Sequence, residues 1–163
     1  MPRRLHPVSV YVEPGSRGKV DARELRRVAR AVMAAEGVAT DVGLEIALAT
    51  PETVRDLNRL YRGRDEATDV LSFAAREVEA GFVEAPGEAA SLGEVVVCAE
   101  VAEQQAASHG RQLRAEVAHL LVHGLLHILG YDHDDPAGAE RMTGREDALL
   151  SELGYGGEYA HGH

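Results

Sequence analysis

The segment HGLLHILGYDH, from His123 to His133, constrains the structure of this chain more than any other part of its sequence. His123 and His127 are four residues apart, a spacing that places two side chains on the same face of a helix. Gly130 lets the chain leave that helix through a left-handed turn, which brings His133 back toward the first two histidines. The spacing predicts a helix that carries two imidazoles and a turn that adds a third.

Three imidazoles in this pattern predict a single zinc ion bound by His123, His127 and His133. Three protein ligands leave one position of a tetrahedral ion to water, which is typical of catalytic rather than structural zinc sites. Zinc lowers the pKa of such a water to about 7, so the segment indicates a hydrolase centre. His119 lies one helical turn upstream, and we expect it to pack beside the site or form a wall of the cleft.

The composition predicts one folded domain. The chain has 163 residues, 45% of them hydrophobic, which is enough for one buried core. We expect this domain to span residues 1–155 and a flexible tail to span 156–163. Cys98 is the single cysteine and lies in an apolar run, so we expect a buried thiol and a reducing, cytoplasmic environment. No segment approaches the ~18 apolar residues of a membrane span.

The overall charge counts against non-specific nucleic-acid binding. The formal net charge is −10, with 27 acidic and 17 basic residues, whereas such binding usually depends on Lys and Arg that neutralise phosphates. A local basic groove is still compatible with an acidic exterior. Aromatic residues make up 4% of the chain and tryptophan is absent. The sequence therefore predicts few surfaces on which nucleic-acid bases could stack.

Hydrophobic periodicity predicts an α+β or mixed α/β domain, and of these we expect α+β, with a small, four-stranded mixed sheet and about five helices. The histidine spacing makes one of these a metzincin-like zinc helix. The capping pair Thr50 and Pro51 begins a helix expected to direct Val54, Leu57, Leu60 and Tyr61 toward the core. Residues 77–91 are expected to form a mobile surface loop. The expected strands span 6–13, 43–50, 69–75 and 92–99; the other expected helices span 21–36, 100–108, 112–129 and 136–153.

The histidine spacing is that of metzincin proteases, but their general base is absent. In those enzymes a glutamate directly follows the first histidine, and here that position is Gly124. General bases typically contribute ~10²–10⁴-fold to a rate. A zinc metallopeptidase therefore remains only an alternative.

Three segments resemble the YbeY family of single-strand-specific metallo-endoribonucleases, also called rRNA maturation factors. They are LNRLYRGRDEATDVLSF (57–73), SLGEVVVC (91–98) and HGLLHILGYDH (123–133), and the likeness extends from about residue 44 to 150. The resemblance implies that the three histidines are the zinc ligands, with one ion per chain, and that Arg62 is important for RNA cleavage. Ala74 stands where the family usually has proline, so we expect the following loop to differ. The residues that match the second motif are Asn58, Tyr61, Arg62, Asp65, Thr68 and Asp69.

The resemblance implies a cytoplasmic, zinc-dependent endoribonuclease that acts on single-stranded ribosomal RNA. It further implies maturation of the 16S rRNA 3′ end, 70S ribosome quality control, and the ribosome or ribosomal proteins as partners. A guanidinium directed at phosphoryl oxygens would stabilise the transition state, so Arg62 is the catalytic candidate, and Arg59 and Arg64 could extend a phosphate-binding track. The alternative for Arg62 is a solvated charge or an ion pair with Asp65.

The sequence identifies no clear general base. Asp132 could handle protons or orient His133, whereas Asp134 and Asp135 are expected to cap the last helix. Asp69 has two open roles, in the site or as a loop anchor, and Tyr131 is expected to pack rather than react. His161 and His163 are expected to be tail residues. The other alternative is a non-catalytic ribosome-binding protein with a structural zinc, in which His119 would be the fourth ligand.

Overall fold

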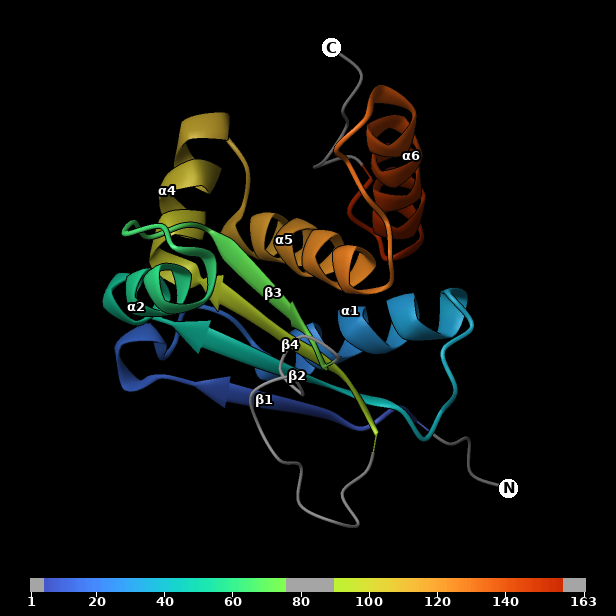
Figure 1. Ribbon diagram of the computed structural model, residues 1–163, viewed down its shortest axis with the longest axis horizontal. Coiled ribbons are helices and arrows are strands. Elements are labelled where there is room, and N and C mark those ends of the chain that lie inside the picture. Colours follow the sequence, from blue (N-terminus) through green and yellow to red (C-terminus); the bar gives the residue numbers. More distant parts are fainter. Residues whose placement is uncertain (1–4, 76–89, 157–163) are drawn as a thin grey trace.

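The fold is centred on a four-stranded mixed sheet, shown in Figure 1 for a computed structural model that describes residues 5–75 and 90–156. The strand order is β1-β2-β4-β3. Strands β1, β2 and β4 are parallel, and β3 pairs with β4 antiparallel at one edge. The predicted mixed sheet is therefore confirmed. The strands are β1 (Val8–Val12), β2 (Gly43–Ala49), β3 (Val70–Ala74) and β4 (Ser91–Cys98).

The described part of the chain contains five α-helices, as the periodicity predicted, and a short 3-10 helix, η1 (Pro14–Ser16), follows β1. Capping residues set where several helices begin. Asp21, Thr50 and Asp135 each accept a hydrogen bond from a backbone N–H of the first turn, which satisfies one of the donors left open there. The helices are α1 (Ala22–Ala35), α2 (Pro51–Arg62), α4 (Ala99–His109), α5 (Leu113–Ile128) and α6 (Pro136–Glu152).

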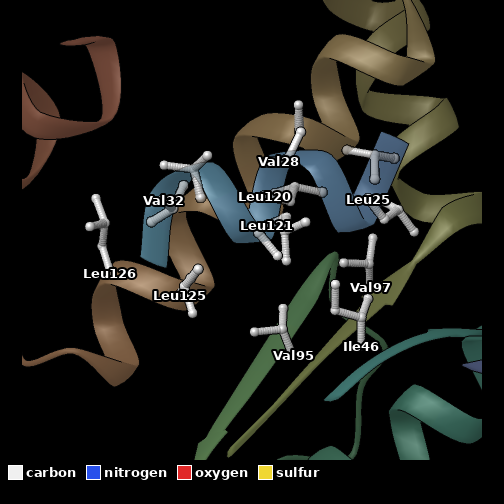
Figure 2. Close-up of a cluster of buried hydrophobic side chains, with 14 of the residues drawn as sticks. Leu25, Val28, Val32, Ile46, Val95, Val97, Leu120, Leu121, Leu125 and Leu126 are labelled. Atoms are coloured by element: carbon white, nitrogen blue, oxygen red, sulfur yellow. The ribbon is translucent and has the colours of Figure 1, made fainter. Parts of the chain in front are cut away.

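The main core lies between the sheet and helices α1 and α5. Figure 2 shows side chains from α1, α5, β2 and β4 meeting, and they belong to one buried hydrophobic cluster. Helix α6 packs on α5 and lies beyond it, away from the sheet (Figure 1). Helix α5 is consequently covered on several sides, and each fully buried leucine contributes about 1.5–3 kcal/mol. This packing gives the histidine-bearing helix a rigid base. The residues of this core that Figure 2 labels are Leu25, Val28, Val32, Ile46, Val95, Val97, Leu120, Leu121, Leu125 and Leu126.

Helix α2 belongs to a second, smaller core that contains Val54, Phe73 and the buried thiol of Cys98. The expectation that Leu60 faces the core is wrong, since it is 69% exposed. Tyr61 is 42% exposed, so the core covers it only in part. Leu60 lies about 120° around the helix from Val54. Tyr61 does share the inward face but lies in the last turn.

Some predicted segments fall outside the described residues. Most of the expected loop 77–91 does so, and its last residue, Ser91, belongs to β4. The expected consequence of Ala74 for that loop and the expected tail beyond residue 156, with His161 and His163, also lie outside them. Across residues 5–75 and 90–156, no helix is both long enough and apolar enough to cross a membrane.

Candidate functional site

The three histidines meet at the C-terminal end of α5. His123 and His127 lie on the helix, and Gly130, with φ of 105°, makes the predicted left-handed turn that returns His133. The His133 ring centroid lies 5.7 Å from that of His123 and 5.7 Å from that of His127. Local geometry therefore brings together the three rings that the sequence singled out.

An open cavity of about 190 Å³ lies between these rings and strand β3. Arg62, from the end of α2, lines the same cavity, although it is 61 residues before His123 in the sequence. The two sequence motifs thus meet in one place. The cavity is lined by Arg62, Val70, Leu71, Ser72, His123, Gly124, His127 and His133.

Glu146 of α6 contacts His123 from outside the cavity lining. The sequence analysis did not identify this residue. It is buried, at 4% exposed. Its Oε1 lies 2.7 Å from Nδ1 of His123 and its Oε2 lies 2.8 Å from Nε2 of His119. The sequence signal that could have identified Glu146 is its place on the buried face of the helix, one turn after Met142 and one turn before Leu150.

The ionisation of Glu146 fixes which ring nitrogens carry protons. Burial raises the pKa of this carboxyl, but the hydrogen bonds from His119 and His123 outweigh burial and lower the pKa to about 2. An ionised carboxylate only accepts hydrogen bonds, so His119 donates through Nε2–H and His123 through Nδ1–H. Neutral His123 then has its lone pair on Nε2. The hydrogen bond with Glu146 also raises the pKa of His123, against the opposing effect of burial.

The donor set of this site fits zinc, although the site is not already closed around an ion. Imidazoles bound at about 2.1 Å around a tetrahedral ion have centroids about 5 Å apart, close to the observed spacing of 5.7 Å. Within the described residues, no three His, Cys, Asp or Glu side chains are yet arranged to hold a metal ion. Metal binding would therefore require some rearrangement of these side chains.

Two contacts with β3 hold Arg62 at the mouth of the cavity. Its Nη2 donates to the carbonyl of Ser72 at 2.9 Å, and its guanidinium lies 5.0 Å from the centroid of the Phe73 ring. The alternative ion pair between Arg62 and Asp65 is wrong, because Asp65 instead accepts two hydrogen bonds from Arg55, at 2.7 and 3.0 Å.

The other two arginines of the expected phosphate track lie outside the cavity lining. Arg59 and Arg64 are exposed and face carboxylates, with nitrogen–oxygen distances of 3.7 Å to Asp56 and 4.0 Å to Glu66. Exposed pairs of this kind are weak, so both guanidiniums can exchange a carboxylate for a phosphate. Their contribution to binding stays a prediction.

Asp132 also lies outside this cavity lining. It is exposed, and its Oδ1 accepts from the backbone N–H of Asp134 at 2.9 Å. The carboxylate partner of a candidate ligand is instead Glu146, acting on His123 rather than on His133. Of the two expected caps of α6, Asp135 performs this role, since its Oδ1 accepts from the N–H of Gly138.

Several residues of the second motif have structural roles. The amide of Asn58 donates to the carbonyl of Glu66 at 2.9 Å. Asp69 anchors the start of β3, where its Oδ1 accepts from the N–H of Val70 at 2.8 Å and from the hydroxyl of Thr68 at 3.3 Å. These contacts hold the loop that follows Arg62. Elsewhere, Tyr131 packs against the core, as expected, and its hydroxyl donates to Glu36.

Gly124 occupies the position where metzincin proteases have their glutamate base, and its surroundings leave little room for a side chain. A Cβ at this position would lie 3.0 Å from Cγ1 of Val95 and 3.5 Å from Cγ2 of Val70. The position after the first histidine therefore faces the sheet, where α5 packs closely. A larger side chain at this position would require Val95 to shift, which weighs against the peptidase alternative.

Comparisons with known proteins agree on one family. Residues 14–154 match the family model described as "Endoribonuclease YbeY". A protein of that name from Moorella thermoacetica is 44% identical over 133 residues, which are 80% of this chain and 85% of the relative. One from Stutzerimonas stutzeri is 47% identical over 120 residues, covering 74% and 72%. One from Chloroflexus aurantiacus is 38% identical over 151 residues, covering 92% and 97%.

The fold has a counterpart among solved structures. The solution structure of a protein from Thermotoga maritima superposes with a TM-score of 0.57 and covers 96% of this chain and 99% of its own. Its sequence is 21% identical, so this likeness concerns the fold alone.

Proposed function

The chain belongs to the YbeY family of endoribonucleases, and on that premise we propose that it is a zinc-dependent endoribonuclease that cleaves single-stranded RNA. The observation that carries the proposal is the shared cavity of Arg62 and the three histidines. An imidazole cluster suits zinc, and a guanidinium beside it suits a phosphodiester.

Each group in the cavity has a chemical role in this proposal. When bound by the three histidines, zinc supplies a Lewis acid and lowers the pKa of a coordinated water. Arg62 binds the phosphodiester and stabilises the charge that accumulates on its phosphoryl oxygens. The Ser72 carbonyl and the Phe73 ring hold the guanidinium in place for this task. Among the described residues that line the cavity, none is a carboxylate, and we assign no side chain as the general base.

The biological setting is part of the same proposal. By its family, the enzyme would act in the cytoplasm on ribosomal RNA, at the 3′ end of the 16S rRNA, and in quality control of 70S ribosomes. Its partners would be the ribosome or ribosomal proteins. Single-stranded RNA fits an open surface cavity because its backbone is not locked in a duplex.

A cleavage assay tests the proposed activity. A labelled single-stranded RNA and its duplex are incubated with zinc-loaded protein, with chelator-treated protein, and with chelated protein to which zinc is restored, beside a casein digestion. We expect cleavage of the single strand only, lost on chelation and regained with zinc. Casein digestion without RNA cleavage would favour the peptidase alternative. Unfolding on chelation, with no cleavage of RNA before it, would favour a structural zinc.

The exposed Tyr61 leads to a separate prediction about RNA affinity. Its ring contacts that of Phe73 at 5.3 Å, edge to face, and Phe73 also lies under Arg62. Stacking on one base contributes about 1–3 kcal/mol. We therefore expect Tyr61→Ala to weaken RNA binding by about 5- to 150-fold at that scale, measured by fluorescence anisotropy with metal-free protein.

The control for this prediction is Tyr11→Ala, because Tyr11 is also an exposed tyrosine, at 63%. It lies on β1, at the opposite edge of the sheet from β3, to which Arg62 donates a hydrogen bond. We expect this variant and Tyr61→Phe to bind RNA as the unaltered protein does. An oligomer that lacks bases should bind both alanine variants equally. Equal RNA affinity of Tyr61→Ala and Tyr11→Ala would contradict a stacking role.

A further inference from the structure

We propose that Glu146 is a positioning residue for His123 and that His119 is the second anchor that holds Glu146 in place. The inference rests on the proposed function, because it concerns how the zinc site is prepared. It assigns roles to two residues outside the three-histidine motif. Glu146 is on α6, and both of its histidine partners are on α5.

The geometry of Glu146 leaves little freedom to its carboxylate. One oxygen accepts from His123 at 2.7 Å and the other from His119 at 2.8 Å, and the side chain is 6% exposed. The two histidines are one helical turn apart, so their ring nitrogens can meet the two oxygens of one carboxylate. The arrangement fixes the position and the orientation of the carboxylate.

This arrangement sets the state of His123 before any metal arrives. Because Nδ1–H donates to Glu146, the ring presents Nε2 as its lone-pair nitrogen, and the ring itself lines the cavity. Metal-binding histidines generally donate their other ring N–H to a carboxylate or carbonyl, which fixes the tautomer and strengthens the ligand. Glu146 meets that requirement from a helix that the histidine motif does not include.

The role of His119 follows from the second oxygen of Glu146. Its Nε2–H occupies Oε2, so the carboxylate is held at both ends and does not turn toward the cavity as a ligand. His119 is also turned toward α6 by the same bond and is outside the cavity lining. We assign it as an anchor of Glu146 rather than the fourth zinc ligand of the structural-zinc alternative.

The first test is zinc affinity, measured by competition with a chromophoric chelator. Outer carboxylate partners typically contribute 10- to 100-fold to metal affinity, and we expect Glu146→Gln to weaken zinc binding by about that factor. The matched control is Glu140→Gln, the same change at an exposed position of the same helix, which should bind zinc normally. His119→Leu should weaken binding, and His119→Gln, which retains an N–H donor, should recover part of it.

The second test needs no metal. Nitrogen-15 chemical shifts of the histidine rings in metal-free protein report which nitrogen carries the proton. We expect the Nδ1–H form of His123 and the Nε2–H form of His119, and a mixed population for His123 in Glu146→Gln. Should that variant not fold, the same shifts in His119→Leu against His119→Gln provide the test.

The outcomes separate this inference from the proposed function. If Glu146→Gln and His119→Leu only lower the melting temperature, with zinc affinity and the His123 tautomer unchanged, Glu146 is a structural tie between α5 and α6 and the inference is wrong. If the unaltered protein binds no zinc, the metal proposal is wrong. The expected tautomers would then still support Glu146 as the residue that orients His123, and their absence would overturn that role too.

Discussion

Replacement of His123 by alanine is expected to abolish detectable RNA cleavage. The change removes one of three candidate zinc ligands, so zinc affinity should fall by more than the 10- to 100-fold that is typical of outer partners. It also leaves Glu146 buried with only its His119 bond, which should lower the free energy of unfolding by about 1–3 kcal/mol. Cleavage rate, zinc affinity and thermal unfolding of the same preparation measure these three effects.

Two further variants identify the cause of that loss. His127→Ala removes a candidate ligand at an exposed position and leaves the bonds of Glu146 intact, so it should lose cleavage and zinc without the same loss of stability. His109→Ala removes an exposed histidine from the end of α4 and should change neither. Undiminished cleavage in both His123→Ala and His127→Ala would reject the proposed zinc site.

The part of this site that local spacing determines could be predicted from the sequence. The positions of His123 and His127 depend on helical periodicity, and that of His133 depends on one left-handed glycine. Both are properties of eleven consecutive residues. The α+β class followed in the same way from alternating and helical patterns, since each element is defined by its own side chains.

The features that the sequence did not reveal depend on contacts between distant elements. Glu146 meets His123 only because α6 packs on α5, and no spacing rule connects the two positions. The partner of Asp65 was misjudged in the same manner, because Arg55 and Arg62 lie on one helix and the course of the following loop decides between them. The exposure of Leu60 depends on how much of α2 the sheet covers.

We expect Arg62→Glu to reduce cleavage of single-stranded RNA by about 10²–10³-fold, the usual effect of losing one electrostatic stabiliser of a transition state. The exchange places a carboxylate at the mouth of the cavity, where the substrate carries a phosphate. The fold should survive because Arg62 is exposed. Zinc affinity should stay within a few-fold of the unaltered value, because Arg62 is not one of the proposed zinc ligands. Initial rates at saturating RNA, measured with zinc affinity, check both statements.

Two matched variants decide whether Arg62 acts in the reaction or only attracts RNA. Arg59→Glu makes the same charge change on the same helix, outside the cavity lining; it should weaken binding at low salt and leave the rate at saturating RNA nearly unchanged. Arg62→Lys keeps the charge but loses the planar fork that binds two phosphoryl oxygens, so its rate should fall between those of Arg62→Glu and the unaltered enzyme. If Arg62→Glu and Arg59→Glu behave alike, and salt removes both effects, Arg62 contributes only to the general attraction of RNA and the assigned role in the transition state is wrong.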